Sequence, residues 1–544
     1  MRSTLVRALT APVVAVLTLV LLPASSGAAT GPPVRCEELA ELAIPADVLG
    51  LPTSGGRVTG AKTVPAAGSI GVYCEVDAEL FPVDPEAPNI EMRVALPAEW
   101  NGKGMMFGGG GYDGAIPSLT ADVPFSSTGA DVPLARGFAV FGSDSGHQVA
   151  PGDLLNAGAF AMNDEALRNF AADALKKTRD AAMFLIDRHY GTKPSYSYFA
   201  GVSSGGREAL AVAQRWPRDF DGVLSGAPAW NAATLDLFFG HMTEILKRPG
   251  AFPSSEKQKL VYDRVMDTCD GDDGVRDGVI SDEAGCDFDP KVLRCEDGKD
   301  RGPNCLSDAQ IEAVRELSSP IEWGYKLGSG ESGYPGLPFL SGADMGTFGL
   351  GIGSRPPSRP LDFTAAFAAN FWDQWAKYFI TRNPDFDGLA FDPKKPGKWK
   401  KRISELTELQ DINNPDLTEF AEAGGKLMLV HGTADPVVSH RSTGEYYERV
   451  RATMGPRAAS QFLRMYSIPG MGHGGPAAFW GGWDSLTALQ RWTEKGIAPQ
   501  EPVVTDINPA SDGRTRPLCE YPRWPRYNGL GDPDRAESFT CVRS

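Results

Sequence analysis

The chain has 544 residues, which corresponds to roughly two to four structural units at about 150 residues each. Hydrophobic residues make up 42% and charged residues 22%, a composition typical of globular proteins that excludes a wholly disordered chain. The net charge of −16 argues against nucleic acid as the main partner, because phosphate binding requires a basic face.

The first 29 residues have the pattern of a secretory signal peptide. Arg2 and Arg7 precede an apolar run from about Ala11 to Leu22, and small residues provide a cleavage site near Ala29. The run is shorter than the ~20 residues that span a bilayer, and no later segment is long and apolar enough, so we expect no membrane anchor. We therefore expect a secreted protein, extracellular or periplasmic, whose eight cysteines form disulfides.

From about Ile90, short apolar runs alternate with helical patterns, which predicts an α/β domain. Apolar residues at helical spacing predict a helix over 163–190, and a second helix follows Val202 until Pro217 stops it. The expected strands, some with their following loops, are 137–144, 195–201, 220–230, 426–436 and 462–473.

The alternation is lost between about 231 and 390, a stretch that holds four of the eight cysteines and many turn residues. We interpret this stretch as an inserted lid. The expected organisation is a signal peptide (1–29), a first part of the core (30–230), a lid insertion (231–390) and a second part of the core (391–544). Cys519 and Cys541 close the tail of the last part.

Residues 201–205 fit the pattern G-x-S-x-G between a predicted strand and a predicted helix. A strand that turns sharply into a helix projects a serine hydroxyl above the sheet, and small flanking residues permit the turn. The pattern alone also fits a Gly/Ser turn without chemistry, and a register slip would select Ser204. Its position favours Ser203 as a nucleophile, with the backbone amide of Ser204 donating to an oxyanion.

A serine nucleophile needs a base and an acid, and this fold presents them in the order Ser, acid, His. Of the six histidines, His473 lies in a Gly-rich loop after the last clear strand, which favours it as the base. Asp435 directly follows an apolar strand and is the expected acid. The alternatives are an exposed loop histidine and an ordinary Asp-Pro turn.

Four consecutive glycines, 108–111, follow a predicted strand. Such a loop lets the backbone approach a substrate closely, so we expect the amides of Gly110 and Gly111 to complete the oxyanion hole. The alternative is a flexible turn without a function.

The segment 269–279 is rich in aspartate but does not match an EF-hand, because two ligand positions fail. Asp270, Asp273 and Asp277 are spaced so that one tight loop could turn three carboxylates inward, and the carbonyls of Val275 and Val279 could complete the shell. Oxygen ligands in a flexible loop suit Ca²⁺. A solvated acidic turn explains the pattern equally well.

Four segments together resemble the tannase and feruloyl esterase family of α/β-hydrolases: GVSSGGRE (201–208), CDGDDGVRDGVI (269–280), HGTADPVVS (431–439) and PGMGH (469–473). The resemblance implies an α/β-hydrolase core, a mostly parallel sheet with helices on both faces, and a large inserted lid. It also implies the triad Ser203, Asp435 and His473, and no organic cofactor. A structural Ca²⁺ held by Asp270, Asp273, Val275, Asp277 and Val279 would lie in the lid.

Family members usually carry cysteines just before the nucleophile and just after the catalytic histidine, whereas this chain has Val202 and Gly474 there. Both are absent together, so the cysteine count stays even. The count alone permits many pairings, and the resemblance implies Cys36–Cys74, Cys269–Cys286, Cys295–Cys305 and Cys519–Cys541.

The sequence thus predicts a secreted serine esterase that hydrolyses feruloyl, galloyl or terephthaloyl-type aromatic esters. Its partner would be a small aromatic ester, with no nucleic acid and no membrane anchor. The aromatic residues 363, 367, 371, 372 and 375 could hold the acyl group, although their spacing favours a helix core for most of them. A secreted serine peptidase and a non-catalytic binding protein on the same scaffold are the alternatives.

Overall fold

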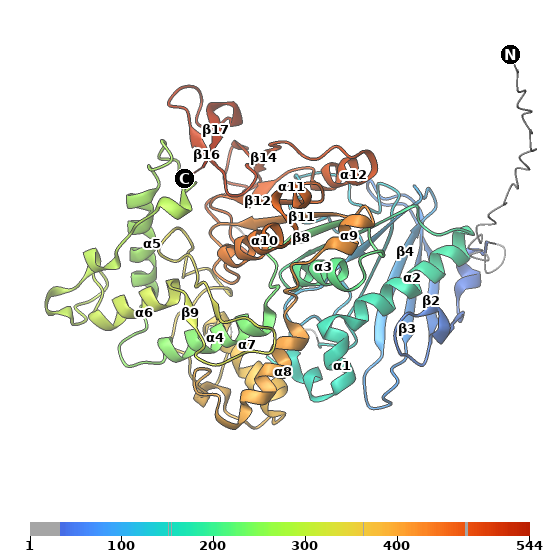
Figure 1. The fold of residues 1–544 in the computed structure, drawn as a ribbon, viewed down its shortest axis with the longest axis horizontal. Coiled ribbons are helices and arrows are strands. Elements are labelled where there is room, and N and C mark those ends of the chain that lie inside the picture. The colour runs from blue at the N-terminus through green and yellow to red at the C-terminus, as the bar shows by residue number, and fades with distance from the viewer. Residues whose placement is uncertain (1–32, 151, 154, 363, 474–476, 544) are drawn as a thin grey trace, which may run out of the picture.

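A ten-stranded mixed sheet runs through the molecule (Figure 1). In spatial order its strands are β1 (Ala43–Ile44), β2 (Gly56–Val64), β3 (Tyr73–Leu80), β4 (Ile90–Pro97), β6 (Ala139–Ser143), β5 (Lys103–Phe107), β7 (Tyr196–Val202), β8 (Gly222–Gly226), β11 (Lys426–Gly432) and β12 (Leu463–Ile468). The first strands, up to the β4–β6 pair, are antiparallel, and the strands from β6 to β12 are parallel. The computed structural model describes residues 33–150, 152–153, 155–362, 364–473 and 477–543, so the expected signal peptide lies outside the described residues.

Small sheets and twelve helices among the described residues complete the architecture. The minor strands are β9 (Ile321–Glu322), β10 (Gly333–Tyr334), β13 (Gly481–Gly482), β14 (Val503–Asp506), β15 (Thr515–Pro517), β16 (Trp524–Tyr527) and β17 (Phe539–Val542). The helices are α1 (Asp164–Arg168), α2 (Ala174–Tyr190), α3 (Ser204–Arg215), α4 (Ala232–Leu246), α5 (Ser255–Cys269), α6 (Asp308–Ser318), α7 (Phe367–Gln374), α8 (Lys400–Gln410), α9 (Thr418–Glu422), α10 (His440–Met454), α11 (Pro456–Ala459) and α12 (Ser485–Lys495).

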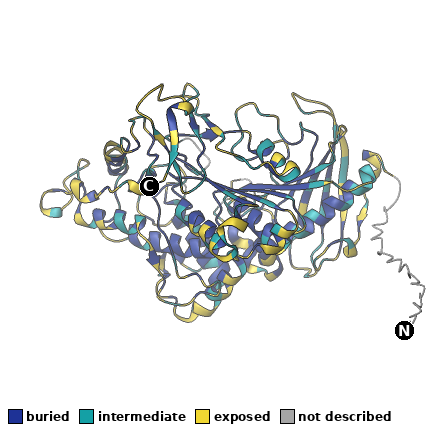
Figure 2. Cartoon of the chain, turned by 45° about the horizontal axis from the view of Figure 1, so that its top comes forward, coloured by how far each residue is buried: buried dark blue, intermediate teal, exposed yellow. Residues whose placement is uncertain are grey.

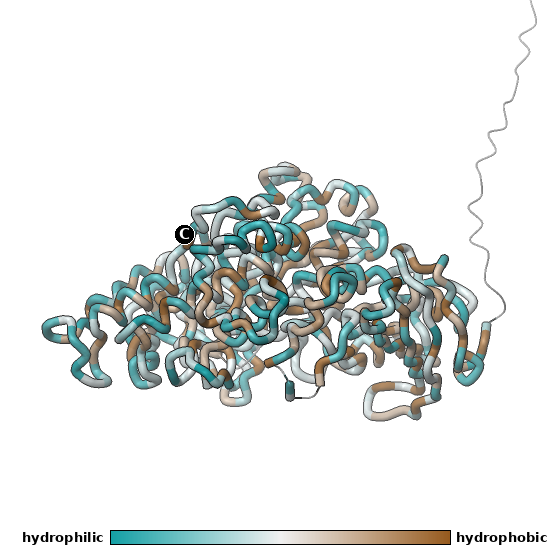
Figure 3. Tube along the Cα trace, turned by 90° about the horizontal axis from the view of Figure 1, so that it is seen from below, coloured by the Kyte–Doolittle hydropathy of each residue, from teal (hydrophilic) through white to brown (hydrophobic). Residues whose placement is uncertain are grey.

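Helices cover both faces of the sheet because its strands are apolar on both sides. Side chains alternate along β7, so Phe199 packs with residues of α2 and α3, whereas Tyr198 packs with residues of α12 on the opposite face. The parallel strands are mostly buried and mostly dark blue in Figure 2, and Figure 3 shows short hydrophobic stretches alternating with hydrophilic ones along the trace. This is the α/β-hydrolase arrangement expected from the sequence, with an antiparallel extension at the N-terminal edge.

No strand of the large sheet lies between Gly226 and Lys426 in the described part of the chain. This connection contains α4 to α9 and supplies most of a hydrophobic cluster that includes the buried Trp372 and Trp375 and also takes in Phe160 and Phe170 from the chain before α2. In Figure 1 it extends from the sheet as the green to orange segment with α5 and α6 at its outer edge. The inserted segment therefore contributes most of a separate hydrophobic core and does not pack on the sheet alone.

The helix predicted over 163–190 is interrupted. A wide turn over Asn169–Asp173 separates α1 from α2, with Ala172 outside helical backbone angles. The guanidinium of Arg207 donates hydrogen bonds to the carbonyls of Phe170 and Ala171 at 2.9 and 2.8 Å, which satisfies backbone groups released by the interruption. Periodicity alone could not reveal this break, because the partner that stabilises it lies on α3.

All four disulfides implied by the family resemblance are present, and the described residues contain no free cysteine. The pairs are Cys36–Cys74, Cys269–Cys286, Cys295–Cys305 and Cys519–Cys541. Two of them lie in the inserted segment, where they close loops between short helices. No helix in the described residues is long and apolar enough to cross a membrane.

Candidate active site

The chain turns sharply at Ser203, between the end of β7 and the start of α3. Ser203 has φ 63° and ψ −119°, a backbone conformation that non-glycine residues rarely adopt and that marks a strained turn. A Cβ on Gly201 would lie 2.4 Å from the Gly205 carbonyl oxygen, and one on Gly205 would lie 2.7 Å from the Gly109 carbonyl oxygen. Only glycine fits at either position, which explains the spacing of the motif.

Ser203, His473 and Asp435 form one chain of hydrogen bonds. The Ser203 hydroxyl lies 3.0 Å from His473 Nε2, and His473 Nδ1 lies 2.5 Å from Asp435 Oδ2. The other carboxylate oxygen of Asp435 accepts the backbone amides of Val437 and Val438 at 2.8 and 2.9 Å. The structure thus brings together the three side chains that the sequence analysis selected from distant segments.

Asp435 is buried, and burial alone would raise its pKa. The charges and hydrogen bonds of His473 and His431 outweigh burial and hold the pKa of Asp435 well below its ordinary value. Asp435 therefore stays ionised and can stabilise a positive charge on His473. His431, also fully buried, was not singled out from the sequence as a partner of Asp435.

The glycine loop predicted to hold an oxyanion lies against the start of α3. Gly110 and Gly111 line the same cavity as Ser203, Ser204 and His473. Within the described part of the chain, no group accepts a hydrogen bond from the amides of Gly110 or Gly111. The Ser204 amide is the first of α3 and has no partner inside the helix, so all three amides are available to a ligand.

The cavity has a volume of about 530 Å³, and its wall is mainly aromatic and aliphatic. Its aromatic lining consists of Tyr112, Phe170, Phe239, Phe367 and Phe371. Of the aromatic residues considered from the sequence, Phe367 and Phe371 line the cavity, whereas Trp372 and Trp375 belong to the core and Phe363 lies outside the described residues. No lysine or arginine is among the described lining residues.

Four polar side chains that the sequence analysis missed line this cavity: Asp236, Tyr112, Asp113 and Gln410. The Tyr112 hydroxyl donates to Asp236 Oδ1 at 3.2 Å. Burial, with a smaller contribution from Asp411, raises the pKa of Asp236 well above its ordinary value and so favours the protonated form of this carboxyl. Asp236 is the only charged residue in the apolar run 232–239, and that isolation was the available signal.

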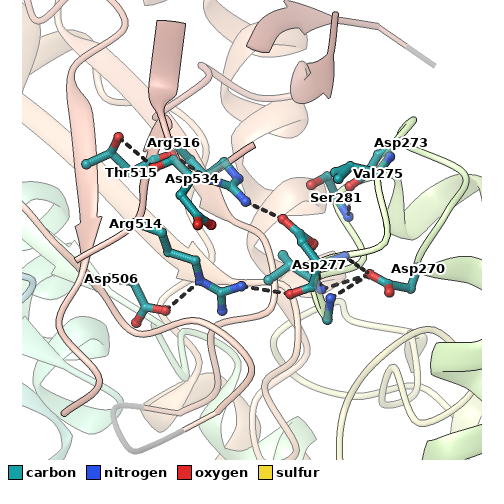
Figure 4. A network of polar contacts seen from close by, with 12 residues as sticks. Asp270, Asp273, Val275, Asp277, Ser281, Asp506, Arg514, Thr515, Arg516 and Asp534 are labelled. Carbon is teal, nitrogen blue, oxygen red and sulfur yellow. Dashed lines mark hydrogen bonds and ion pairs between the residues drawn. The ribbon is translucent and has the colours of Figure 1, made fainter. Parts of the chain in front are cut away.

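The aspartates predicted to bind calcium lie in one loop after α5, with Asp270 near Asp277 and Asp273 apart from them (Figure 4). Asp270 Oδ1 accepts hydrogen bonds from the amides of Asp277, Gly278 and Val279 at 3.3, 2.9 and 3.0 Å. Asp277 forms an ion pair with Arg516, and Arg514 donates to the Asp277 carbonyl at 2.8 Å. The C-terminal strand β15 is therefore attached to this loop through Arg514 and Arg516 (Figure 4).

The loop offers oxygen donors of the kind that Ca²⁺ prefers, but the Asp277 carboxylate is already paired with Arg516. Asp270 and Asp273 are buried, and neither forms an ion pair with a described residue. Burial raises the pKa of Asp273 to about 6. The described residues hold no group of three or more His, Cys, Asp or Glu side chains placed to share a metal ion, so calcium stays a prediction.

Val202 and Gly474 stand at the two positions where the family resemblance implied an additional disulfide. Val202 lines the cavity beside Ser203. Gly474 lies outside the described residues. The described contacts that hold His473 in place are those with Asp435 and Ser203.

The large sheet, the strained serine turn and the hydrogen-bonded Ser–His–Asp set define an α/β-hydrolase. A family model described as "Tannase and feruloyl esterase" matches residues 74–542. The chain belongs to the tannase and feruloyl esterase family, and it is a carboxylic ester hydrolase.

Individual relatives match over nearly the whole chain. An uncharacterised esterase of Agrobacterium fabrum is 36% identical over 93% of this chain and 93% of its own. Mono(2-hydroxyethyl) terephthalate hydrolase of Piscinibacter sakaiensis is 29% identical over 89% of this chain and 87% of its own. The crystal structure of feruloyl esterase B from Aspergillus oryzae, 24% identical, superposes with a TM-score of 0.75 over 90% of this chain and 98% of its own, which supports the fold.

Proposed function

We propose that this chain is a secreted serine esterase that hydrolyses esters of aromatic carboxylic acids through an acyl-enzyme on Ser203. The observation that carries the proposal is the position of the Ser203 hydroxyl, hydrogen-bonded to His473 at the wall of a cavity lined by aromatic rings. The feruloyl, galloyl and terephthaloyl groups considered from the sequence are all planar rings that such a cavity can bury.

In the proposed mechanism, Ser203 Oγ attacks the ester carbonyl carbon while His473 Nε2 accepts the hydroxyl proton. Asp435 stabilises the resulting imidazolium, and the amides of Ser204, Gly110 and Gly111 donate to the oxyanion. His473 then returns the proton to the leaving alcohol. Water, deprotonated by His473, attacks the acyl-enzyme and releases the aromatic acid.

Secretion is supported by the N-terminal sequence pattern and by four disulfides, which form in oxidising compartments. Sequencing the N-terminus of protein recovered from the culture medium or the periplasm tests this part of the proposal. A mature N-terminus close to residue 30 is expected, and an intact Met1 would contradict it.

A structural Ca²⁺ is the second part of the proposal. Asp270, Asp273 and Asp277, with the carbonyls of Val275 and Val279, would hold it through oxygen atoms alone. The ion would neutralise buried carboxylates at the base of the inserted segment and would take no part in the chemical steps.

The catalytic proposal is tested with Ser203→Ala on a panel of feruloyl, galloyl and terephthaloyl esters. We expect hydrolysis to fall by several orders of magnitude and labelling by a fluorophosphonate to disappear. Ser195→Ala is the matched control, because Ser195 is exposed at the opposite end of the same strand. Undiminished turnover in Ser203→Ala would refute the assignment, and faster cleavage of peptides than of esters would indicate a peptidase.

A further inference from the structure

Helix α3 holds the glycine loop at two points. Glu208 Oε2 accepts the amide of Gly109 at 2.9 Å, and the Ser204 hydroxyl donates to the Gly111 carbonyl at 2.6 Å. Ser204 and Glu208 are four residues apart and therefore lie on one face of the helix. Gly110 sits between the two attachment points, so the orientation of its amide depends on both.

A second carboxyl group lies under the same loop without a hydrogen-bond donor. Both oxygens of Asp113 are buried, and no described residue donates to either of them with ordinary geometry. Asp113 and Glu208, which is 1% exposed, meet at Gly109: a Cβ there would lie 2.2 Å from Asp113 Oδ1, and the Gly109 amide donates to Glu208 Oε2 at 2.9 Å. Burying an ionised carboxylate without hydrogen-bond donors costs free energy, so the position of Asp113 beside Glu208 requires an explanation.

The positive charge of Arg207 lowers the pKa of both carboxyl groups and so offsets part of this cost, but Arg207 donates a hydrogen bond to neither of them. Arg207 is adjacent to Glu208, but its guanidinium is bound to the carbonyls of Phe170 and Ala171. Burial and the charge of Glu208 raise the pKa of Asp113 well above its ordinary value, and burial also raises the pKa of Glu208. Two adjacent buried carboxyl groups do not both ionise; one keeps its proton and donates it to the other.

We propose that Asp113 and Glu208 share one proton, and that this pair of carboxyl groups positions the Gly109–Gly111 loop to bind the oxyanion. Both are positioning residues, and the inference rests on the proposed function of Ser203. The shared proton resides on Asp113, and Glu208, as the acceptor, keeps its hydrogen bond to Gly109. Ser145 Oγ, at 3.3 Å from Glu208 Oε1, supports the same carboxylate from another side.

Contact between the pair and the loop is direct. A Cβ on Gly109 would lie 2.2 Å from Asp113 Oδ1, and a Cβ on Gly108 would lie 2.7 Å from Glu208 Oε2. The loop backbone is therefore in contact with both carboxyl groups. If Asp113 and Glu208 were both ionised, the repulsion between them would displace the loop. Because Glu208 occupies the Gly109 amide, the amides of Gly110 and Gly111 are the ones left for the substrate.

The consequence is a selective effect on the chemical step. An oxyanion exists only after Ser203 has attacked the ester, so a displaced loop lowers kcat and leaves KM nearly unchanged. Removal of one oxyanion donor typically costs about 10²–10³ in rate, which sets the scale of the expected loss.

Asp113→Leu and Asp113→Asn separate the proposal from a purely structural role. The leucine removes the proton donor, and we expect kcat to fall about 10²- to 10³-fold with KM within about threefold. The asparagine amide donates to Glu208 as a protonated Asp113 does, and we expect it to recover kcat to within about threefold of the unmodified enzyme. Affinity for an arylboronic acid, which mimics the tetrahedral adduct, falls in parallel with kcat, whereas affinity for the aromatic acid product does not.

Two results would overturn the inference: a loss in Asp113→Asn as large as in Asp113→Leu, or losses confined to KM. If Asp113→Leu does not fold, Asp113→Asn tests the proposal by itself. A role that required an ionised Asp113 predicts that kcat falls about 10²-fold in Asp113→Asn, whereas a shared proton predicts nearly full activity. Ser203→Ala distinguishes a failure of the proposed function from a failure of the shared-proton proposal. Turnover in Ser203→Ala refutes the proposed function itself, whereas an inactive Ser203→Ala with an impaired Asp113→Asn refutes only the shared proton.

Discussion

His431 donates a hydrogen bond through Nε2 to Asp435 Oδ2 at 3.1 Å, the same oxygen that lies against His473. The other nitrogen of His431 accepts from the Thr443 hydroxyl at 2.8 Å, which fixes the tautomer. Burial lowers the pKa of His431, so it acts as a neutral donor. Asp435 is therefore held from both sides, and its orientation does not depend on His473 alone.

We expect His431→Phe to impair catalysis without abolishing it. The ring keeps most of the volume but removes a hydrogen bond to a buried charge, a loss of about 1.5–3 kcal/mol. If that loss falls on the orientation of Asp435, kcat/KM decreases about 10- to 100-fold. Steady-state kinetics and urea unfolding measure the two effects.

His189→Phe is the control for this variant. His189, in the last turn of α2, bonds to the Val34 carbonyl at 3.0 Å and is not among the residues that line the candidate active site. It should lose some stability and no activity. Equal kcat/KM in His431→Phe and the unmodified enzyme would show that the second histidine does not support Asp435.

The contribution of Asp144 to the stability of the fold should decrease as pH rises from about 4 to about 7. Burial raises the pKa of Asp144 to about 7, so between these values the folded chain keeps a proton that the unfolded chain has lost. A raised carboxyl pKa therefore contributes stability at low pH that disappears as the pH rises through the folded pKa. Asp435 and Glu283 have the opposite pH dependence. Their pKa values are lowered in the folded chain, so they stabilise the fold at neutral pH and lose this contribution only in strong acid.

Asp144→Asn isolates this effect. Asn keeps the Oδ1 contacts with the amides of Glu91 and Gly146 and can pair with a rotated Gln148 amide. Relative to the unmodified protein, the variant should gain on the order of 2–4 kcal/mol between about pH 5 and about pH 8. Urea unfolding at both values measures the gain, and a pH-independent difference would contradict the assignment.

The sequence was sufficient to predict much of the site because its chemistry is encoded locally. Ser203 and its flanking glycines form a turn whose residue requirements are steric, and Asp435 directly follows a strand. His473 could be selected because only six histidines exist. The four disulfides, in contrast, depended on a family resemblance, since the number of cysteines alone permits many pairings.

What the sequence could not reveal are contacts that join distant segments. Asp113 and Glu208 are far apart in the chain and meet only because β5 and β7 are neighbours in the sheet. The interruption between α1 and α2 depends on Arg207, and the polar end of the cavity depends on where α4 packs. None of these contacts has a local pattern, because each results from tertiary packing.

Removal of calcium should destabilise the protein and leave the chemical mechanism intact. We expect about one Ca²⁺ per chain by elemental analysis and a lower Tm in the presence of a chelator, because bound metal stabilises the folded state. Asp273→Asn should lower the Tm without chelator and make it insensitive to chelator. An unmodified protein that holds no calcium and shows the same Tm with chelator would refute the site.

The Cys269–Cys286 disulfide should support the same loop. Cys269 directly precedes Asp270, so the double variant Cys269→Ser, Cys286→Ser frees one end of the aspartate loop. We expect a loss of about 3 kcal/mol together with weaker calcium binding. Cys295→Ser with Cys305→Ser is the matched control: it opens a loop of comparable length, with a separation of 10 residues against 17, and should leave calcium affinity unchanged. Equal calcium affinity in both double variants would separate the disulfide from the metal.

The cavity should discriminate against an acyl ring that carries a second negative charge. Its described lining holds no lysine or arginine, and its polar end is formed by Asp236, whose pKa is raised by burial, and Tyr112. A carboxylate buried there would have no cationic partner, whereas a neutral substituent could be accepted. We expect kcat/KM for monomethyl terephthalate to be at least about 100-fold below that for methyl benzoate at neutral pH.

A charge-free ester and a cavity variant separate charge from size. Dimethyl terephthalate is longer than the monoester but neutral, so it should react nearly as well as methyl benzoate if charge is the cause. Asp236→Asn removes the carboxyl group that would lie next to the carboxylate of the monoester. The variant should therefore reduce the difference in kcat/KM between the monoester and the diester. A monoester that reacts as fast as the diester in the unmodified enzyme would show that a cationic group outside the described lining reaches the cavity.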